Sequence, residues 1–144
     1  MKVADLIEGR KDVYSVREET SVHETAMYLR DRQVRAVGVL APDGKLVGVI
    51  SQSDISDKVA AENKCPAWMK TSDIMTRNLI TVAPEMALED CLRLMEKHGI
   101  YHLLVVEPAG KYLGMLSVTD LLQVISSDNK ERADLLEALL FPQR

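Results

Sequence analysis

Several features that would point to a definite chemistry are missing from this chain of 144 residues. It has two cysteines, Cys65 and Cys91, which form neither a C-x-x-C pair nor a His/Cys cluster with metal-ligand spacing. We therefore expect two free thiols in a reducing compartment and no bound metal. The formal net charge is −4 and no basic cluster interrupts it, so a nucleic-acid-binding surface is not predicted.

Long apolar segments are also missing. No run approaches the roughly 20 apolar residues that a membrane-spanning helix needs, so no contact with a membrane is expected. The start of the chain, residues 1–5, lacks the apolar stretch of a secretion signal. The composition, 47% hydrophobic and 28% charged, is typical of a globular protein, and we expect a cytoplasmic location.

The common catalytic motifs are missing as well. The chain contains no G-x-G-x-x-G, no Walker loop, no H-E-x-x-H and no nucleophile elbow. His98 and His102 have the i, i+4 spacing of a helical metal pair, but Gly99 between them is expected to end the helix. Neither an enzyme nor a catalytic cofactor is predicted.

What the chain does contain is a repeat. Residues 48–55 return as residues 114–121, a constant offset of 66, and both copies keep the pattern Gly-hydrophobic-hydrophobic-Ser-x-x-Asp-hydrophobic. A register that holds through strand, turn and helix indicates a duplicated structural unit. Such a unit usually has to bury its apolar face against its twin.

Each repeat predicts the order strand, helix, strand, strand, helix. Ser21 and Glu24 have the spacing of a capping box, which predicts the start of the first helix. A right-handed crossover makes the first two strands parallel, and a hairpin adds the third strand antiparallel. The expected strands are 13–16, 36–40, 46–50, 79–82, 101–106 and 112–117, and the expected helices are 21–32, 53–62, 88–98 and one from 119.

The predicted fold class is therefore α/β (α+β), with two β-α-β-β-α repeats packed with pseudo-twofold symmetry. Each repeat is a small mixed three-stranded sheet with helices on one face. We assign residues 1–62 to the first repeat with its N-terminal segment, 63–70 to a linker, 71–126 to the second repeat and 127–144 to a C-terminal helix. The apolar stripe of this last helix is expected to cover the core or to meet a sister subunit.

This arrangement resembles a tandem cystathionine-β-synthase-type (CBS) domain pair, the Bateman module. The resemblance covers about residues 2–125 and rests on the repeated Ser-x-x-Asp pattern and on residues 99–107, which are similar to the family's second strand. It implies a regulatory module that binds an adenosine-containing ligand, such as AMP, ATP, NAD or S-adenosylmethionine, in clefts between the repeats.

Stand-alone pairs of this family commonly form homodimers, so the resemblance also implies a homodimer. Because no effector domain accompanies the pair in this sequence, we expect a ligand sensor that acts in trans on an unknown protein partner. The alternative is a structural or protein-interaction disc that binds no ligand.

Two carboxylates are the main candidates for ligand contact. Asp54 and Asp120 are expected to accept hydrogen bonds from the two hydroxyl groups of a ribose, as the acidic residue of dinucleotide-binding folds does. Helix capping explains the same carboxylates without a ligand, and a duplicated fold duplicates its caps. The hydroxyls of Ser51 and Ser117 are expected to meet ribose or phosphate beside the exposed amides of a helix N-terminus.

The remaining candidates lie at the strands of each repeat. The first strand of each repeat is expected to line the adenine-binding site. One basic residue in each repeat is the nearest candidate for contact with a phosphate. Gln52 and Ser53 stand where many relatives of this family have Arg and an acid, which removes a phosphate partner from the first cleft. The adenine candidates are Tyr14, Ser15, Ile80 and Thr81, and the phosphate candidates are Arg35 and His102, the latter also readable as an ordinary strand histidine.

Overall fold

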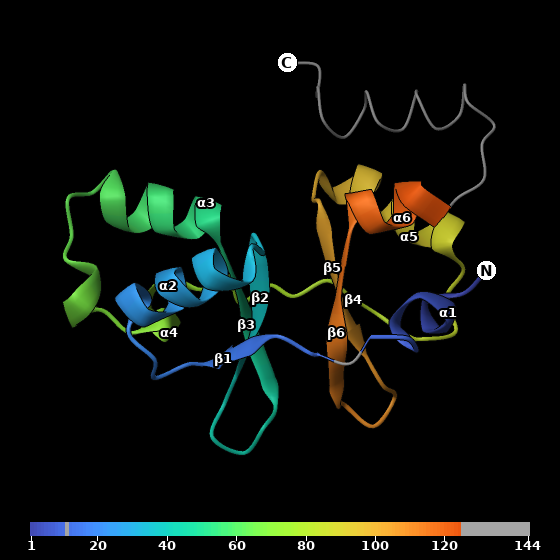
Figure 1. Cartoon of the computed structure of the whole chain (residues 1–144), viewed down its shortest axis with the longest axis horizontal. Helices are drawn as coiled ribbons and strands as arrows, with labels where there is room; N and C mark the ends of the chain where they lie inside the picture. The colour runs from blue at the N-terminus through green and yellow to red at the C-terminus, as the bar shows by residue number, and fades with distance from the viewer. Residues whose placement is uncertain (11, 125–144) are drawn as a thin grey trace. The chain divides into compact units, whose positions relative to one another are not determined.

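The computed structural model of the chain describes residues 1–10 and 12–124. The chain divides into two compact units that alternate along the sequence (Figure 1). The Asp54 unit comprises residues 12–79 and 109–112, and the Asp120 unit comprises the described residues among 1–11, 80–108 and 113–144. The predicted C-terminal helix, residues 127–144, lies outside the described residues.

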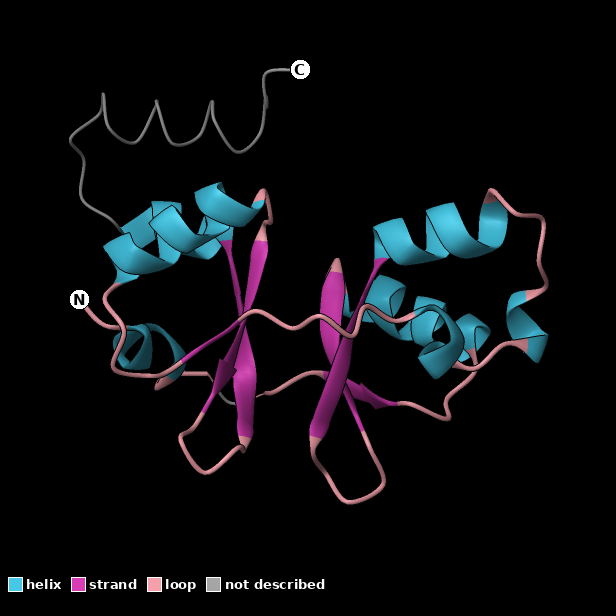
Figure 2. Cartoon of the chain, turned by 180° about the vertical axis from the view of Figure 1, so that it is seen from behind, coloured by secondary structure: helices cyan, strands magenta, loops and turns pink. Residues whose placement is uncertain are grey.

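The Asp54 unit contains a three-stranded sheet in the order β1-β2-β3. Strand β1 is parallel to β2, and β2 is antiparallel to β3, as the repeat predicts. The helices of the unit lie on one face of this sheet (Figures 1 and 2). The elements are β1 (Ser15–Arg17), α2 (Val22–Arg32), β2 (Ala36–Leu40), β3 (Leu46–Ser51), α3 (Gln52–Ile55), the π-helical turn η1 (Ser56–Ala60), the 3-10 turn η2 (Pro66–Trp68) and α4 (Thr71–Ile74).

Local sequence signals account for the bounds of α2. The hydroxyl of Ser21 accepts a hydrogen bond from the backbone N–H of Glu24 at 3.1 Å, which confirms the predicted helix start. The helix ends at Gln33, whose φ of 55° is left-handed. Its buried residues Val22 and Leu29 pack into an apolar core together with valines of β1 and β2 and with Ile50 of β3.

The Asp120 unit repeats the same plan. Its sheet has the order β4-β5-β6, with β4 parallel to β5, and its helices lie on one face (Figure 2). Its core contains the fully buried leucines of α5, β5 and β6. The elements are α1 (Val3–Ile7), β4 (Thr81–Val82), α5 (Leu88–His98), β5 (His102–Val106), β6 (Tyr112–Ser117) and α6 (Val118–Val124).

The short helix that precedes the first repeat packs in the unit of the second repeat. Val3 of α1 is fully buried and belongs to the core of the Asp120 unit. Its backbone N–H donates to the carbonyl of Met86 at 2.9 Å, and the carbonyl of Met1 accepts from the N–H of Leu88 at 3.2 Å. The chain start thus satisfies the first amide of α5, whose N-cap, Ala87, has no side chain that could do so.

The short helix α4 makes the reciprocal exchange. It precedes the first strand of the second repeat, yet it packs in the Asp54 unit, where the hydroxyls of Thr71 and Thr25 lie 2.7 Å apart and fully buried. The hydroxyl and the N–H of Thr71 both donate to the carbonyl of Thr20, each at 2.8 Å. The division predicted from the repeat, 1–62 and 71–126, follows the order of the chain, whereas the packing units exchange these two helices.

Gly48 of β3 lets the segment after α4 approach this strand. A Cβ atom at Gly48 would lie 2.5 Å from Sδ of Met75 and 3.2 Å from the carbonyl oxygen of Thr76. Two backbone hydrogen bonds join the segment to the strand, from Val49 N–H to the Thr76 carbonyl (3.0 Å) and from Thr76 N–H to the Val49 carbonyl (2.8 Å). The glycine is therefore needed for a close backbone approach.

The two cysteine thiols differ in burial. Both cysteines are free, as predicted, but Cys65 is exposed and Cys91 of α5 is buried. Burial raises the pKa of the Cys91 thiol to about 11, and the neighbouring carboxylates of Asp90 and Glu89 add to the shift. Within the part of the chain that the structure describes, no helix is long and apolar enough to cross a membrane.

We expect Gly48→Ala to lower the free energy of unfolding by about 1–3 kcal/mol, because the added methyl group overpacks the contact with Met75 and Thr76. Urea unfolding followed by circular dichroism measures the change. Gly9→Ala is the matched control, since a Cβ atom at Gly9 would meet nothing within 4 Å. An equal loss in both variants would contradict the role of Gly48.

We expect one thiol per native chain to react with Ellman's reagent at pH 8, and two after unfolding, because the Cys91 thiol is buried and protonated. The unfolded thiol ionises above its ordinary pKa of 9.0, whereas the folded thiol ionises only near 11. The contribution of Cys91 to the free energy of unfolding should therefore be constant below about pH 9 and then fall by about 1.4 kcal/mol per pH unit up to about pH 11. Cys91→Ala should lack this part of the pH dependence.

Candidate functional site

In each unit the chain turns from its third strand into a helix at the Ser-x-x-Asp motif. The N–H of Ser51 donates to Oδ2 of Asp54 at 3.0 Å, and the N–H of Asp54 donates to Oγ of Ser51 at 3.2 Å. The same pair of bonds joins Ser117 and Asp120, at 2.9 and 3.1 Å. These are reciprocal capping boxes, so the capping interpretation is confirmed for both carboxylates. Contact with a ligand stays a prediction.

The first amide of each helix is also used within the chain. The N–H of Gln52 donates to the carbonyl of Arg35, and the N–H of Val118 donates to the carbonyl of Tyr101, both at 2.9 Å. The third amide of each helix bonds to the serine hydroxyl of the motif. This corrects the expectation that these helix N-termini offer exposed amides to a phosphate, because two of the first three amides of each helix already donate to groups of the chain.

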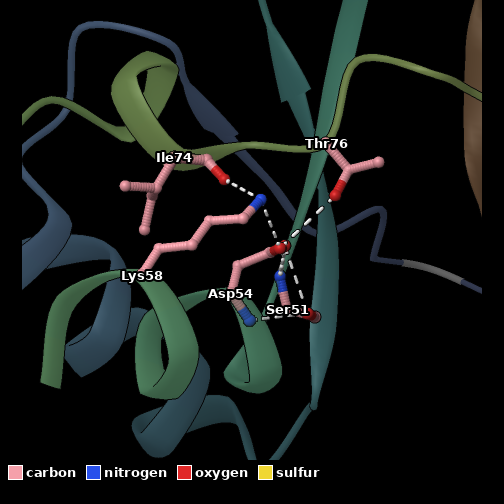
Figure 3. A network of polar contacts seen from close by, with 5 residues as sticks. All are labelled: Ser51, Asp54, Lys58, Ile74 and Thr76. Atoms are coloured by element: carbon pink, nitrogen blue, oxygen red, sulfur yellow. Dashed lines mark hydrogen bonds and ion pairs between the residues drawn. The ribbon is translucent and has the colours of Figure 1, made fainter. Parts of the chain in front are cut away.

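The carboxylate of Asp54 is surrounded by donors from its own unit (Figure 3). Its Oδ1 lies 3.0 Å from Nζ of Lys58 and accepts from the hydroxyl of Thr76 at 3.3 Å. Its Oδ2 accepts from the hydroxyl of Ser51 at 3.2 Å, in addition to the capping bond. Lys58 also donates to the carbonyl of Ile74 at 2.8 Å. Only 12% of the Asp54 side chain is exposed.

The carboxylate of Asp120 has a different environment. Nη2 of Arg10 lies 3.0 Å from its Oδ2, and Nη1 of Arg10 donates to the carbonyl of Met115 at 2.5 Å. Both charged side chains are 34% exposed. Among residues 1–10 and 12–124, no group donates to Oδ1 of Asp120. The two copies of the motif therefore form the same cap but differ in the groups that contact Oδ1 of the aspartate.

The other candidates of the first repeat lie at the starts of β1 and β2. Ser15 is the first residue of β1, and its N–H donates to the hydroxyl of Tyr28 at 3.2 Å. The ring of Tyr14 stands edge-on to that of Tyr28, with centroids 6.3 Å apart. Arg35 precedes β2, and its carbonyl meets the start of α3 while its side chain is exposed. The structure therefore brings the backbone of Arg35 to the motif, through its carbonyl.

The candidates of the second repeat lie at the starts of β4 and β5. Thr81 is the exposed first residue of β4 and pairs with Leu104 of β5. Ile80, directly before it, is half-buried against the core of the Asp120 unit. His102 is the half-buried first residue of β5. All three belong to the same unit as Ser117 and Asp120.

Three polar partners of the carboxylates were not predicted from the sequence. Lys58 lies four residues after Asp54, a spacing that pairs opposite charges on a helix, so the pattern could have indicated it. Thr76 follows α4 and Arg10 follows α1, the two exchanged helices. No local pattern relates these two residues to the motifs that they contact.

No group of three or more His, Cys, Asp or Glu side chains in the described part of the chain is arranged to hold a metal ion. His98 ends α5 and Gly99 follows it with a left-handed φ of 63°, so the helix stops before His102. The i, i+4 spacing of the two histidines therefore does not place both on one helix.

The chain belongs to the CBS domain family. Residues 3–61 and 72–127 each match a CBS domain, so the two matches cover both repeats. This confirms the predicted tandem pair.

Related proteins share the pair within longer chains. The chain is 31% identical over 126 residues to an uncharacterized protein of Methanocaldococcus jannaschii, with 88% of this chain and 40% of the relative covered. It is 30% identical over 116 residues to an uncharacterized protein of Methanopyrus kandleri, with 81% of this chain and 59% of the relative covered. The chain thus spans between two fifths and three fifths of the length of these relatives.

Solved structures confirm the fold. A conserved CBS domain protein of Thermoplasma acidophilum has a TM-score of 0.83 at 20% identity, with 98% of this chain and 77% of that chain covered. A CBS domain protein of Pyrobaculum aerophilum, complexed with AMP, has a TM-score of 0.79 at 24% identity, with coverages of 93% and 99%. The CBS domain pair of protein MJ0100, in complex with 5′-methylthioadenosine and S-adenosyl-L-methionine, has a TM-score of 0.76 at 27% identity, with coverages of 86% and 94%.

We expect Ser117→Ala to lower the free energy of unfolding by about 1 kcal/mol, because the N–H of Asp120 loses its acceptor at the start of α6. Ser117→Thr keeps a hydroxyl and should stay closer to the wild type. Chemical denaturation of the three proteins measures the difference. Equal stability of all three would show that the hydroxyl does not cap the helix.

Proposed function

We propose that this chain is a regulatory module that binds an adenosine-containing ligand through the Asp120 unit. Asp120 would accept hydrogen bonds from the ribose hydroxyls. Ile80 and Thr81 would line the adenine, and His102 would lie toward the phosphate. The observation that carries the proposal is the state of the Asp120 carboxylate: its Oδ2 is fixed by Ser117 and Arg10, while its Oδ1 accepts nothing from the described residues.

The chemistry of a ribose supports this assignment. Its two neighbouring hydroxyl groups can both donate hydrogen bonds, and one carboxylate oxygen can accept two of them. A carboxylate that is already oriented by its own backbone loses little conformational entropy when such a ligand binds. Asp120 meets both conditions, since the N–H of Ser117 holds it in place.

Arg10 supports an anionic ligand. Its guanidinium contacts Asp120 and the carbonyl of Met115 and is one third exposed, so part of this cationic group is accessible beside the proposed ribose site. Arginine is well suited to phosphate and carboxylate groups because its donors form a planar fork. We propose that Arg10 contributes to binding the charged part of the ligand.

The relatives support the class of ligand. The CBS domain pair of protein MJ0100, at 27% identity, holds two adenosine derivatives. We propose that the ligand of this chain likewise belongs to the adenosine class, with AMP, ATP, NAD and S-adenosylmethionine as the first molecules to test.

The proposal is for regulation and not for catalysis. Relatives named homoserine O-acetyltransferase and inosine-5′-monophosphate dehydrogenase match this chain over 22% of their own length, so most of each relative lies outside the match. Action in trans on a partner protein, homodimerisation and a cytoplasmic location stay predictions from the sequence.

We expect an adenosine ligand at about 100 times its Kd to stabilise the protein by about 2.7 kcal/mol, which raises Tm by several degrees. A thermal-shift screen of AMP, ATP, NAD and S-adenosylmethionine measures this. Asp120→Asn should remove the shift, because an amide can retain the capping oxygen but presents N–H donors where the ribose hydroxyls need an acceptor.

Asp5→Asn is the matched control. Asp5 lies in the same unit and also caps a short helix, since it accepts from the N–H of Lys2 at 2.8 Å, but it is outside the Ser-x-x-Asp motif. The ligand-induced shift should persist in this variant. Flat melting curves with all four ligands would contradict the proposal and favour the alternative of a ligand-free interaction module.

A further inference from the structure

We propose that the Asp54 site is closed by the chain's own side chains, so that the protein binds one adenosine-containing ligand per chain and not two. This inference rests on the proposed function of the Asp120 site. It concerns Lys58, Thr76 and Tyr28, none of which belongs to the repeated motif.

The first argument is the acceptor capacity of the carboxylate. A carboxylate offers about four lone-pair positions. At Asp54 all four have donors: the N–H and the hydroxyl of Ser51 on Oδ2, and Nζ of Lys58 and the hydroxyl of Thr76 on Oδ1. A ribose hydroxyl could bind there only by displacing one of them.

The donors on Oδ1 are held by further bonds (Figure 3). Lys58 donates at the same time to the carbonyl of Ile74, and the backbone of Thr76 forms two hydrogen bonds with Val49 of β3. Displacing either donor would therefore also disturb the end of α4 and the segment that follows it. Displacing Lys58 would also break the charge-assisted contact between its ammonium group and the carboxylate of Asp54, whose side chain is only 12% exposed.

The second argument concerns the place expected for the base. The amide of Ser15 on β1, a backbone donor expected to face adenine, already donates to the hydroxyl of Tyr28. The ring of Tyr28 is itself fixed, because the guanidinium of Arg32 lies 3.6 Å from its centroid and Tyr14 packs edge-on against it.

The second repeat has other side chains at the positions that match Tyr28, Arg32 and Lys58. At the offset of 66, Leu94 stands in place of Tyr28 and His98 in place of Arg32, so the position that matches Tyr28 offers no hydroxyl to the amide of Thr81. Val124 stands in place of Lys58, so no ammonium group is offered to Asp120 from α6. The carbonyl of Met115, which matches Val49, accepts from the side chain of Arg10 where Val49 accepts from a backbone N–H.

Isothermal titration calorimetry of the full chain tests the inference, with AMP as the probe, or whichever of ATP, NAD and S-adenosylmethionine gives the largest thermal shift. We expect a stoichiometry of one per chain. Asp120→Asn should weaken binding at least tenfold. Asp54→Asn should keep the stoichiometry and change Kd by less than twofold. Two sites per chain, or loss of binding in Asp54→Asn alone, would overturn the inference.

A second measurement tests the closure of the Asp54 carboxylate even if none of the four molecules binds. In urea unfolding without ligand, Asp54→Asn and Lys58→Met should each lower the midpoint, and the double variant should lose much less than the sum of the two. The matched pair Asp120→Asn and Arg10→Gln should be close to additive, because that ion pair is more exposed. Additive effects at Asp54 and Lys58 would show that the carboxylate is not closed, whereas absence of binding alone would refute only the proposed function.

Discussion

Both units depend on the way a carboxylate closes the turn from the third strand into the following helix. The N–H of the motif serine donates to Oδ2 of the aspartate three residues later, and the N–H of the aspartate donates back to the serine hydroxyl. This exchange fixes the rotamer of the aspartate and commits one of its two oxygens. Whether each aspartate can accept a hydrogen bond from a ligand therefore depends on the groups that contact its other oxygen, Oδ1.

The exchanged short helices determine part of that environment. Helix α1 precedes the first strand of the first repeat but packs in the core of the Asp120 unit, and it leads into Arg10. Helix α4 precedes the first strand of the second repeat but packs in the Asp54 unit, and it leads into Thr76. A ligand that changes the contacts of Asp120 would thus act on the segment that enters the first strand. Such a difference in contacts between bound and free states is what a regulatory response requires.

Strong local patterns made most of the fold predictable. The strands 36–40 and 112–117 and the helix 88–98 have their predicted bounds, because apolar periodicity and clear turn signals flank them. The helix expected at 53–62 instead divides into α3 and the π-helical turn η1. The exchange of α1 and α4 could not be predicted, since a repeat fixes the register of its copies but does not say which core an amphipathic flank covers. For the same reason Arg10 and Thr76 were missed, whereas the repeat itself singles out Ser51, Asp54, Ser117 and Asp120 as candidates.

Duplication of a motif predicts two caps but not two binding sites. Capping depends on residues inside the motif, so it is copied together with the sequence, whereas occupancy of Oδ1 depends on residues that have diverged. A donor held in the same unit competes with a ligand at an effective concentration of millimolar or more. Lys58 and Thr76 compete in this way for Oδ1 of Asp54, while the ion pair of Arg10 engages Oδ2 of Asp120, the oxygen that the cap already holds. A ribose would therefore have to compete with Lys58 and Thr76 for Oδ1 of Asp54. At Oδ1 of Asp120, no described residue competes with it.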